Sequence, residues 1–410
     1  MAVTLSVALD EANRCLGCKN PQCMQGCPIH TPIPEVIKLF KEGKMTEAGK
    51  ILADNNPMTT ICCLVCDHEK QCEGNCVLGK KTAPVHFSMI EDYISSQYAQ
   101  LVEYEKPEWN GKKIAVVGAG PAGMTVAVNL AKLGYKVDIL DSNAKIGGVM
   151  RYCIPKFRLP DEVLDNILEK TLIPLGINVR PNTTVGEEVS VEDLFRDGYD
   201  ALFAGAGLWR PRKLGIKGES FAHVSYGFQY LQSPESYVAG KNVAIIGVGN
   251  SAIDCARTAI RRGAKKVTCY ARRDGITASR SESQSATHEG IEFVFCHRPV
   301  EIYDDKIEFA ITEKQEDGRF IDAACEHEFC EADQVIICAG QLSRFNLSSK
   351  GESNDMRDHV GLAVDENCMT AFPGIFAGGD MTVGSLTVVH AVEDAKIAAD
   401  AIHRYLSENK

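Results

Sequence analysis

The stretch KIAVVGAGPAGMTVAVNLAKLGYKVDILD, residues 113–141, decides the fold of a large part of this 410-residue chain. An apolar run, a glycine-rich turn, a helical stretch and a second apolar run follow one another, which predicts a strand–turn–helix–strand unit. Gly118, Gly120 and Gly123 give the spacing G-x-G-x-x-G directly after the first run. The first glycine permits a tight turn, the second lets a pyrophosphate approach the backbone, and the third lets the helix pack closely.

An acidic residue ends this unit. Asp141 lies 23 positions after Gly118, at the end of the second apolar run. In dinucleotide-binding units an acid at this place binds the ribose hydroxyls, while the pyrophosphate lies at the positive N-terminus of the helix. A lone G-x-G-x-x-G indicates only a tight turn, whereas this whole arrangement predicts a dinucleotide site.

A second unit of the same kind covers residues 241–273. Gly247 and Gly249, with an alanine three positions later, match the variant G-x-G-x-x-A. An alanine occupies the acid position, and Arg272 and Arg273 follow it. Two guanidinium groups in place of a carboxylate suit the 2′-phosphate of NADP better than the bare ribose of NAD. The alternative is that both arginines are solvated surface charges.

Two different dinucleotides in one chain indicate a flavin that exchanges hydride with a nicotinamide. We expect FAD at the first site and NADPH, rather than NADH, at the second. The C-terminal stretch from Phe372 again has the pattern of strand, glycine turn and helix. Its Gly378, Gly379 and Asp380 are expected to close the flavin domain from the far end of the sequence.

Composition limits the class of protein. The formal charge is −11, which argues weakly against nucleic acid or anionic membrane as a partner. The first residues lack a basic segment before an apolar run, and no stretch approaches 18 apolar residues, so we expect neither a secretory signal nor a membrane span. We therefore expect a cytoplasmic, reducing compartment, where clustered cysteines bind metal more often than they form disulfides.

Nine of the seventeen cysteines lie between Cys15 and Cys76. The segment CLGCKNPQCMQGCP starts at Cys15 and resembles the cysteine run of bacterial ferredoxins that ends in Cys-Pro, with x4 where that run has x2. A second run of three cysteines follows at Cys66, Cys72 and Cys76. The two runs together supply seven thiolates, one fewer than two four-cysteine sites need. Zinc is the competing metal, but it prefers paired C-x2-C knuckles and has no redox chemistry beside a flavin. The same region predicts helices in IPEVIKLFKEGKMTEAGKIL and MIEDYISSQYAQLVEYE, before a linker KPEWNGK.

Six motifs, taken in order, resemble the glutamate synthase small-subunit family: CLGCKNPQCMQGCP, VCDHEKQCEGNCVLG, GAGPAG, IGGVMRYCIPKFRLP, GVGNSAIDCARTAIRRGA and FPGIFAGGD. That family includes the N-terminal half of dihydropyrimidine dehydrogenase and the flavoprotein subunits of ferredoxin:NADP transhydrogenases. The resemblance covers essentially the whole chain. It implies an α/β protein with a helical N-terminal domain that carries two 4Fe–4S clusters, followed by FAD- and NAD(P)-binding Rossmann-like domains arranged as in disulfide reductases. The implied domains are 1–108 for iron–sulfur, 109–238 with 342–410 for FAD, and 239–341 for NAD(P)H.

The resemblance to dihydropyrimidine dehydrogenase also implies how the cluster ligands divide. Cys15, Cys18, Cys23 and Cys76 would hold the first cluster, and Cys27, Cys66, Cys72 and Glu91 the second. The alternatives for Glu91 are an exposed helix residue, or replacement as ligand by Cys62 or Cys63. Further contacts are expected to FAD from Pro121, Gly148, Arg151 and Thr387, and to NADPH from Asn250, Ser251 and Gly340.

Two positions depart from the family pattern. Asp141 replaces the commoner glutamate, and Cys153 stands where glycine is common. We expect Cys153 to be a small buried residue rather than a redox thiol.

Three functions follow as hypotheses. The first is an electron-transfer subunit within a hetero-oligomer, which passes electrons between NADPH, FAD, two clusters and a partner subunit or ferredoxin. The complex would be glutamate synthase-like, electron-bifurcating or ferredoxin-linked. The second is a stand-alone reductase of a small acceptor such as polysulfide or a quinone. The third is a redox-sensing module without turnover. No general acid, base or nucleophile is expected in this chain.

Overall fold

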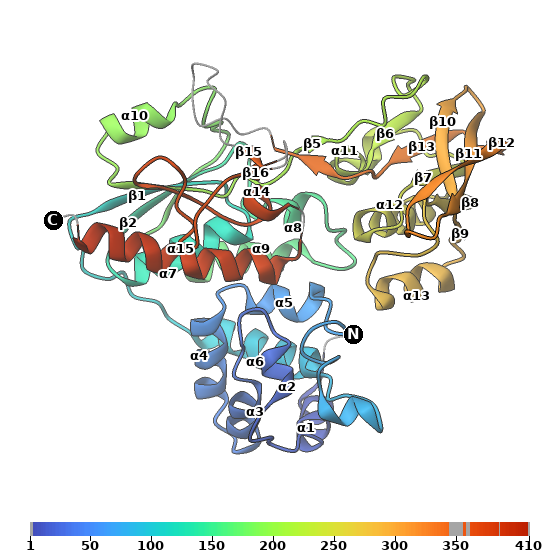
Figure 1. The fold of residues 1–410 in the computed structure, drawn as a ribbon. Coiled ribbons are helices and arrows are strands. Elements are labelled where there is room, and N and C mark those ends of the chain that lie inside the picture. Colours follow the sequence, from blue (N-terminus) through green and yellow to red (C-terminus); the bar gives the residue numbers. More distant parts are fainter. Residues whose placement is uncertain (1–2, 344–355, 358–360, 385, 409–410) are drawn as a thin grey trace. The chain divides into compact units, whose positions relative to one another are not determined.

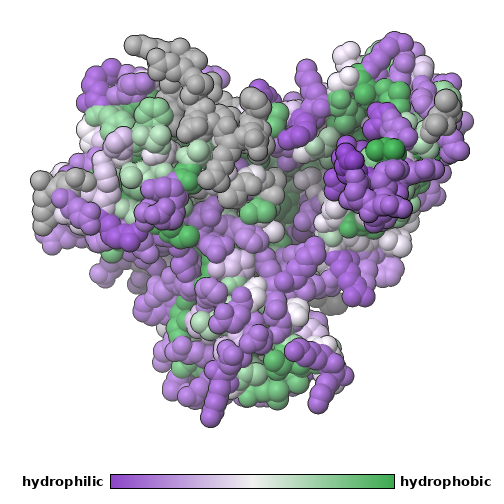
Figure 2. All heavy atoms as spheres, viewed as in Figure 1, coloured by the Kyte–Doolittle hydropathy of each residue, from purple (hydrophilic) through white to green (hydrophobic). Residues whose placement is uncertain are grey.

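The computed structural model describes residues 3–343, 356–357, 361–384 and 386–408, so parts of the predicted segment 342–410 lie outside the described residues. The chain divides into two compact units. The first unit comprises residues 1–151, 156–208 and 342–410, and the second comprises residues 152–155 and 209–341. On the face drawn in Figure 2, hydrophilic side chains dominate the surface. None of the helices in the described ranges combines the length and apolar character that crossing a bilayer requires.

The N-terminal part of the first unit is helical (Figure 1), as the sequence predicted. The predicted helix of residues 33–52 is two helices, because Gly43 adopts a φ of +75° between them. The four apolar positions that define its buried face all lie in the core: Ile33, Val36, Ile37 and Phe40. The helices are α1 (Leu5–Asn13), α2 (Gln22–Gln25), α3 (Ile33–Lys41), α4 (Met45–Asn55), α5 (Thr59–Val65) and α6 (Phe87–Leu101).

A five-stranded parallel sheet forms the rest of the first unit, in the order β17-β4-β1-β2-β3. Helices α7 and α15 pack together on one side, and α10 packs on the other through Val191 and Leu194. The long helix α15 is the red helix of Figure 1. The elements are β1 (Lys113–Val117), α7 (Pro121–Lys132), β2 (Lys136–Leu140), α8 (Val149–Tyr152), α9 (Asp161–Ile167), β3 (Asn178–Arg180), α10 (Val191–Arg196), β4 (Ala201–Ala204), β15 (Met356–Arg357), β16 (Gly361–Leu362), β17 (Ile375–Ala377), α14 (Asp380–Val383) and α15 (Val388–Glu408).

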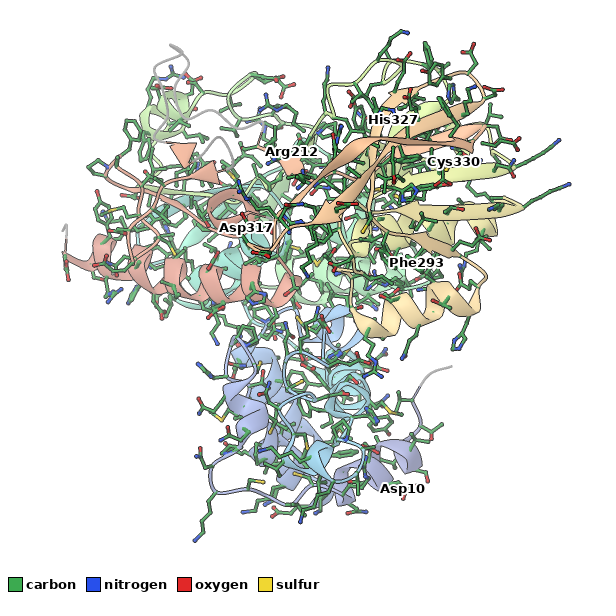
Figure 3. All side chains as sticks on the ribbon, turned by 45° about the vertical axis from the view of Figure 1, so that its right-hand side comes forward. Asp10, Arg212, Phe293, Asp317, His327 and Cys330 are labelled. Atoms are coloured by element: carbon green, nitrogen blue, oxygen red, sulfur yellow. The ribbon has the colours of Figure 1, made fainter. Side chains whose placement is uncertain are left out.

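The second unit contains another five-stranded parallel sheet, in the order β6-β13-β7-β8-β9, and an antiparallel meander β10-β11-β12. Figure 3 shows the side chains of His327 and Cys330 on β12 of this meander. The elements are β5 (Arg210–Pro211), β6 (Val224–Tyr226), α11 (Gly227–Gln232), β7 (Asn242–Ile246), α12 (Asn250–Arg261), β8 (Lys266–Tyr270), α13 (Arg280–His288), β9 (Glu292–Val294), β10 (His297–Ile302), β11 (Lys306–Lys314), β12 (Phe320–Glu331), β13 (Gln334–Ile337) and β14 (Gln341–Leu342).

The division between the two sheets differs from the predicted boundary at residue 238. Residues 209–238 belong to the second unit, because β6 pairs in parallel with β13. This pairing joins strands more than a hundred positions apart, so no local pattern announces it. The helical region predicted as a separate domain groups with the first sheet in one compact unit.

Candidate functional site

The three glycines of the first turn have three different surroundings. Gly118 has a φ of +100°, and a Cβ there would lie 2.5 Å from the carbonyl oxygen of Gly205. At Gly123 a Cβ would lie 1.9 Å from the carbonyl oxygen of Gly118. At Gly120, by contrast, a Cβ would meet no heavy atom within 4 Å, and helix α7 begins at the next residue, Pro121. The backbone is therefore open at the second glycine, where a pyrophosphate would approach the free amide groups of the helix.

Asp141 ties the ends of β1 and β2 together. Its Oδ2 accepts a hydrogen bond from the backbone of Ala119 at 2.6 Å, and its Oδ1 accepts one from the backbone of Asn143 at 2.7 Å. The residue is buried, and this burial raises the pKa of its carboxyl. The carboxylate thus fixes the glycine turn at the carboxyl edge of the sheet, where the ribose of a dinucleotide would lie.

Two distant glycines gather at the same turn. A Cβ on Gly148 would lie 2.9 Å from the Cα of Gly120, and one on Gly379 would lie 3.2 Å from the Cβ of Ala122. The amide of Gly379 donates to Asp394 Oδ2 at 2.9 Å. The segments predicted to close the flavin site therefore do meet the first turn.

The other predicted flavin contacts are held within their own segments. The buried Arg151 donates through Nε to the carbonyl of Ile146 and through NH2 to Asp165, both at 2.6 Å. Asp380 Oδ1 accepts from the backbone of Leu386 at 3.2 Å. Thr387 Oγ1 shares a hydrogen bond with His390 Nδ1 at 2.7 Å.

The second turn repeats the first with one change. Gly247 has a φ of +135°, and a Cβ there would lie 2.6 Å from the carbonyl oxygen of Cys338. Around Gly249 the nearest atom to a Cβ is Thr277 Oγ1, at 3.6 Å. The third position holds Ala252, whose methyl group is enclosed in the core. The second glycine of this turn is again the open one.

The remaining predicted NADPH contacts lie at the same edge of the second sheet. Asn250 Oδ1 accepts from the backbone of Ser279 at 2.9 Å, and Ser251 is half-buried in the first turn of α12. Gly340 follows β13, the neighbour of β7, and has a φ of +99°. Arg272 and Arg273 follow β8 closely, and both are exposed.

The cysteines predicted for the first cluster lie together. Cys15, Cys18, Cys23 and Cys76 line one cavity with apolar side chains such as Ile33, Ile37 and Phe87, and Cys72 of the second predicted set also lines it. Burial raises the pKa of the Cys23 thiol to about 11, and the other three cysteines add to this rise. All four are only partly buried, so this group lies near the surface.

The residues predicted for the second cluster also lie together, but deeper. Cys27 and Cys72 are buried, and Glu91 is 7% exposed, so Glu91 is not an exposed helix residue. A hydrogen bond with Cys62, burial and the nearby Glu91 and Cys72 raise the pKa of the Cys66 thiol. Burial, Glu91 and Cys27 raise the pKa of the Cys72 thiol.

The side chain of Thr59 holds Glu91. Thr59 Oγ1 donates to Glu91 Oε1 at 2.7 Å. Burial raises the pKa of this carboxyl to about 7, although the bond from Thr59 opposes the rise. Cys62 contacts Cys66, while Cys63 donates to the carbonyl of Thr60 at 3.3 Å. Glu91 and Cys62 therefore both lie beside the thiols of the second group.

Comparison with known proteins gives matches along the whole chain. Residues 1–102 match the family model of dihydropyrimidine dehydrogenase domain II, 4Fe-4S cluster, and residues 86–194 and 112–395 match that of pyridine nucleotide-disulphide oxidoreductase. The chain is 33% identical to the glutamate synthase [NADPH] small chain of Escherichia coli K12, over 97% of this chain and 91% of that one. The chain belongs to the glutamate synthase small-chain family.

The chain is also similar to a subunit of a different enzyme and, in fold, to solved reductase structures. The NAD-dependent dihydropyrimidine dehydrogenase subunit PreT of Escherichia coli K12 is 31% identical, over 99% of this chain and 96% of that one. Among solved structures, FprA from Mycobacterium tuberculosis has a TM-score of 0.64 at 18% identity and covers 72% of this chain and 85% of its own. Thioredoxin reductase of T. acidophilum has a TM-score of 0.55 at 21% identity, over 73% of this chain and all of its own.

Membership of the glutamate synthase small-chain family makes the chain an NAD(P)H-dependent oxidoreductase with a 4Fe–4S domain and an FAD-binding reductase fold. The predicted fold class is confirmed. Both cysteine groups fit the chemistry of a cluster, because each brings together several thiols whose thiolate charges a cationic metal core would neutralise. Within the described ranges no three His, Cys, Asp or Glu side chains converge as they would around a single ion.

Sequence reasoning missed three supporting residues. Asp394 holds the turn at Gly379, Thr59 holds Glu91, and Thr277 borders the second turn. Each of them contacts a residue more than ten positions away in the sequence. Of the three, only Asp394 could have been noticed in the sequence, as an acidic residue on the inner side of α15. Cys153 is buried, as predicted, and burial raises the pKa of its thiol. The sixteen cysteines whose side chains the structure describes form no disulfide.

Proposed function

We propose that this chain is the reductase subunit of a larger enzyme, in which electrons pass from NADPH through FAD and two 4Fe–4S clusters to a partner subunit or ferredoxin. Two relatives support a partner through their names, which are a "small chain" and a "subunit" of larger enzymes. The seventeen cysteines support a reducing, cytoplasmic location for this assembly.

The residues divide the work between two sites. A bound flavin takes a hydride from a nicotinamide and releases its electrons one at a time, which suits clusters that accept single electrons. Gly120 leaves room for the FAD pyrophosphate at the start of α7, and Asp141 presents a carboxylate where the ribose would lie. Gly249 and the start of α12 repeat this arrangement for NADPH.

The observation that carries the proposal is the difference in burial between the two cysteine groups. Cys27, Cys72 and Glu91 of the second group are buried in the unit that also holds the flavin turn, while Cys66 is partly buried. The first group lies partly exposed, and the neighbouring Leu16 is 65% exposed. Electrons would thus enter at the buried group and leave at the exposed one, where a partner protein can approach.

For the ligands we propose Cys15, Cys18, Cys23 and Cys76 at the first cluster, and Cys27, Cys66, Cys72 and Glu91 at the second. A carboxylate is a harder ligand than a thiolate, so Glu91 would give the second cluster a different potential. For the nucleotide we propose NADPH, because Arg272 and Arg273 stand exposed after β8 without a carboxylate at position 271.

Anaerobic purification with iron, sulfide and flavin analysis tests the cofactor content. We expect about eight irons and one FAD per chain. NADPH should bleach the flavin faster than NADH does, and a partner iron–sulfur or flavin subunit should co-purify. A colourless or zinc-containing protein would contradict the proposal. Rapid steady turnover of the isolated chain with polysulfide or a quinone would instead identify a stand-alone reductase, and a flavin that NADPH does not bleach would identify a sensor.

A further inference from the structure

A row of hydrogen-bonded side chains runs from the C-terminal helix to one cysteine of the second group. Lys396 Nζ on α15 donates to Asn55 Oδ1 at 2.6 Å. Asn55 Nδ2 donates to Thr31 Oγ1 at 3.2 Å. Thr31 Oγ1 in turn lies 3.3 Å from Cys27 Sγ. Four residues from three separate segments of the chain therefore form one continuous row.

The row has a single direction. An ammonium group has only donors, so Asn55 turns its carbonyl oxygen to Lys396 and its NH2 group to Thr31. The hydroxyl of Thr31 accepts that bond, which leaves its own proton for Cys27. When Cys27 is a metal-bound thiolate it is an acceptor only. In each hydrogen bond of the row the donor then lies on the side of Lys396 and the acceptor on the side of the Cys27 sulfur.

The surroundings strengthen the row. Cys27 is 8% exposed and Thr31 is 5% exposed, so water does not compete for the last bond. Burial lowers the pKa of Lys396, and the side chains of Cys27 and Asp400 oppose this shift. Helix α15 also carries Asp394, which holds the amide of Gly379 at the flavin turn. One helix therefore contacts both the flavin turn and the row that ends at Cys27.

We propose that Lys396, Asn55 and Thr31 are positioning residues that raise the reduction potential of the cluster bound through Cys27. This inference rests on the proposed function, because it needs Cys27 to be a cluster ligand. Reduction adds one electron and no bond changes, so the site gains one negative charge. A donated hydrogen bond and a nearby ammonium stabilise that charge more than they stabilise the oxidised form. The row thus makes this cluster a better acceptor.

Potentiometric titration of the complete, anaerobically purified protein, followed by electron paramagnetic resonance, tests the row. Thr31→Val removes the hydroxyl group that donates to Cys27. Lys396→Met removes the ammonium group of α15, which lies outside the cysteine-rich segment. We therefore expect each variant to shift the reduced-to-oxidised ratio of one cluster by about tenfold, which is about 59 mV for one electron. The other cluster should keep its potential. Thr31→Ser keeps the hydroxyl and should keep the wild-type potential.

Lys132→Met is the matched control. Lys132 on α7 pairs with Asp54 at 3.0 Å, one position before Asn55, but it lies outside the row. The Lys132→Met variant should leave the reduction potentials of both clusters unchanged. The proposal is overturned if Thr31→Val and Lys396→Met keep both potentials while they retain full iron and flavin. A wild-type protein without iron would defeat the proposed function and this inference together, whereas unmoved signals in a loaded protein would defeat the inference alone.

Discussion

The two glycine turns have the same backbone arrangement, but different residues surround them. In the first unit Gly123 leaves no room for a methyl group, since a Cβ would lie 1.9 Å from the carbonyl of Gly118. In the second unit Ala252 occupies the same place and is packed in the core. The third position of the first turn therefore admits no side chain, whereas the third position of the second turn holds a methyl group.

The charge at the end of the second strand also differs. Asp141 follows β2, whereas an alanine with Arg272 and Arg273 follows β8. The helices are also covered differently. Helix α7 packs on α15, while α12 is joined to α13 and Glu289 by the ion pairs of Arg257 and Arg261. A few side chains therefore distinguish the two copies of one motif, and the following changes test this contrast.

The largest effect is expected in the first turn. Gly123→Ala should destabilise the first unit by about 1–3 kcal/mol, the usual cost of overpacking, because the new methyl group meets backbone rather than a movable side chain. Thermal unfolding followed by circular dichroism measures this.

Gly120→Ala is its matched control. A methyl group there meets no protein atom, so the melting temperature should stay near that of the wild type while FAD content falls. Full FAD content in this variant would show that the open space at Gly120 is not the pyrophosphate site.

Next in size is the choice of nucleotide. Replacing Arg272 and Arg273 together by alanine should raise KM for NADPH about 10–100-fold, because hydrogen bonds to a charged group contribute about 1.5–3 kcal/mol. KM for NADH should change by less than about twofold, since NADH carries no 2′-phosphate. Arg319→Ala provides the control, because Arg319 is an exposed arginine of the same unit that pairs with Asp317. An equal loss with both nucleotides would contradict the assignment.

Much of this contrast could be predicted from sequence, because it is local. The glycines, Asp141 and the two arginines follow their strands at fixed spacing, and the structure places them at the predicted edges. The two groups of cysteines could be divided only through a family resemblance, since Cys76 joins the first group across a gap of 53 positions from Cys23. The spacing of the cysteines alone does not show that the chain brings Cys76 back to the first group.

The features that could not be predicted depend on distant pairing. The boundary at residue 238 was wrong because β6 pairs with β13, which contributes nothing to local periodicity. The ion pairs of Arg151 could not be predicted either, because its partners Asp161 and Asp165 lie on a helix that the sequence pattern did not predict. Acids and arginines are usually exposed, so composition and spacing offered no reason to expect this buried group.

A smaller effect is expected at Asp141. Asp141→Asn keeps the size of the side chain but turns an NH2 group toward one of the backbone amides whose hydrogen bonds the carboxylate now accepts. FAD should bind about tenfold more weakly, since one hydrogen bond to a charged group is lost. Flavin release during dilution measures this.

Asp200→Asn is the comparison for Asp141. Asp200 accepts from the backbone of Lys113 at the opposite end of β1, so its replacement should leave flavin release unchanged. Equal release from both variants would mean that the Asp141 effect is general destabilisation rather than a contact with the ribose.

The smallest effect concerns the ion pairs that cover α12. Hydrogen bonds from Arg261 and Arg257 lower the pKa of Glu289 from 4.5 to about 2. Because the folded pKa is depressed, this pair stabilises the second unit above about pH 4.5, and that contribution is lost as the pH falls toward about 2. Glu289→Gln should therefore lower the free energy of unfolding by about 1 kcal/mol at pH 7, a value limited by the partial exposure of the pair.

Tryptophan fluorescence can isolate this effect. The chain has two tryptophans, and Trp109→Phe leaves Trp209 of the second unit as the only one. In that background, urea unfolding at pH 7 and at pH 3 compares the parent chain with its Glu289→Gln variant. The difference in their free energies of unfolding should shrink with acid, because protonation removes the charge that the substitution has already removed. A difference of the same size at both pH values would mean that Glu289 stabilises α12 through packing, and the contrast between a buried α7 and an ion-paired α12 would then no longer hold.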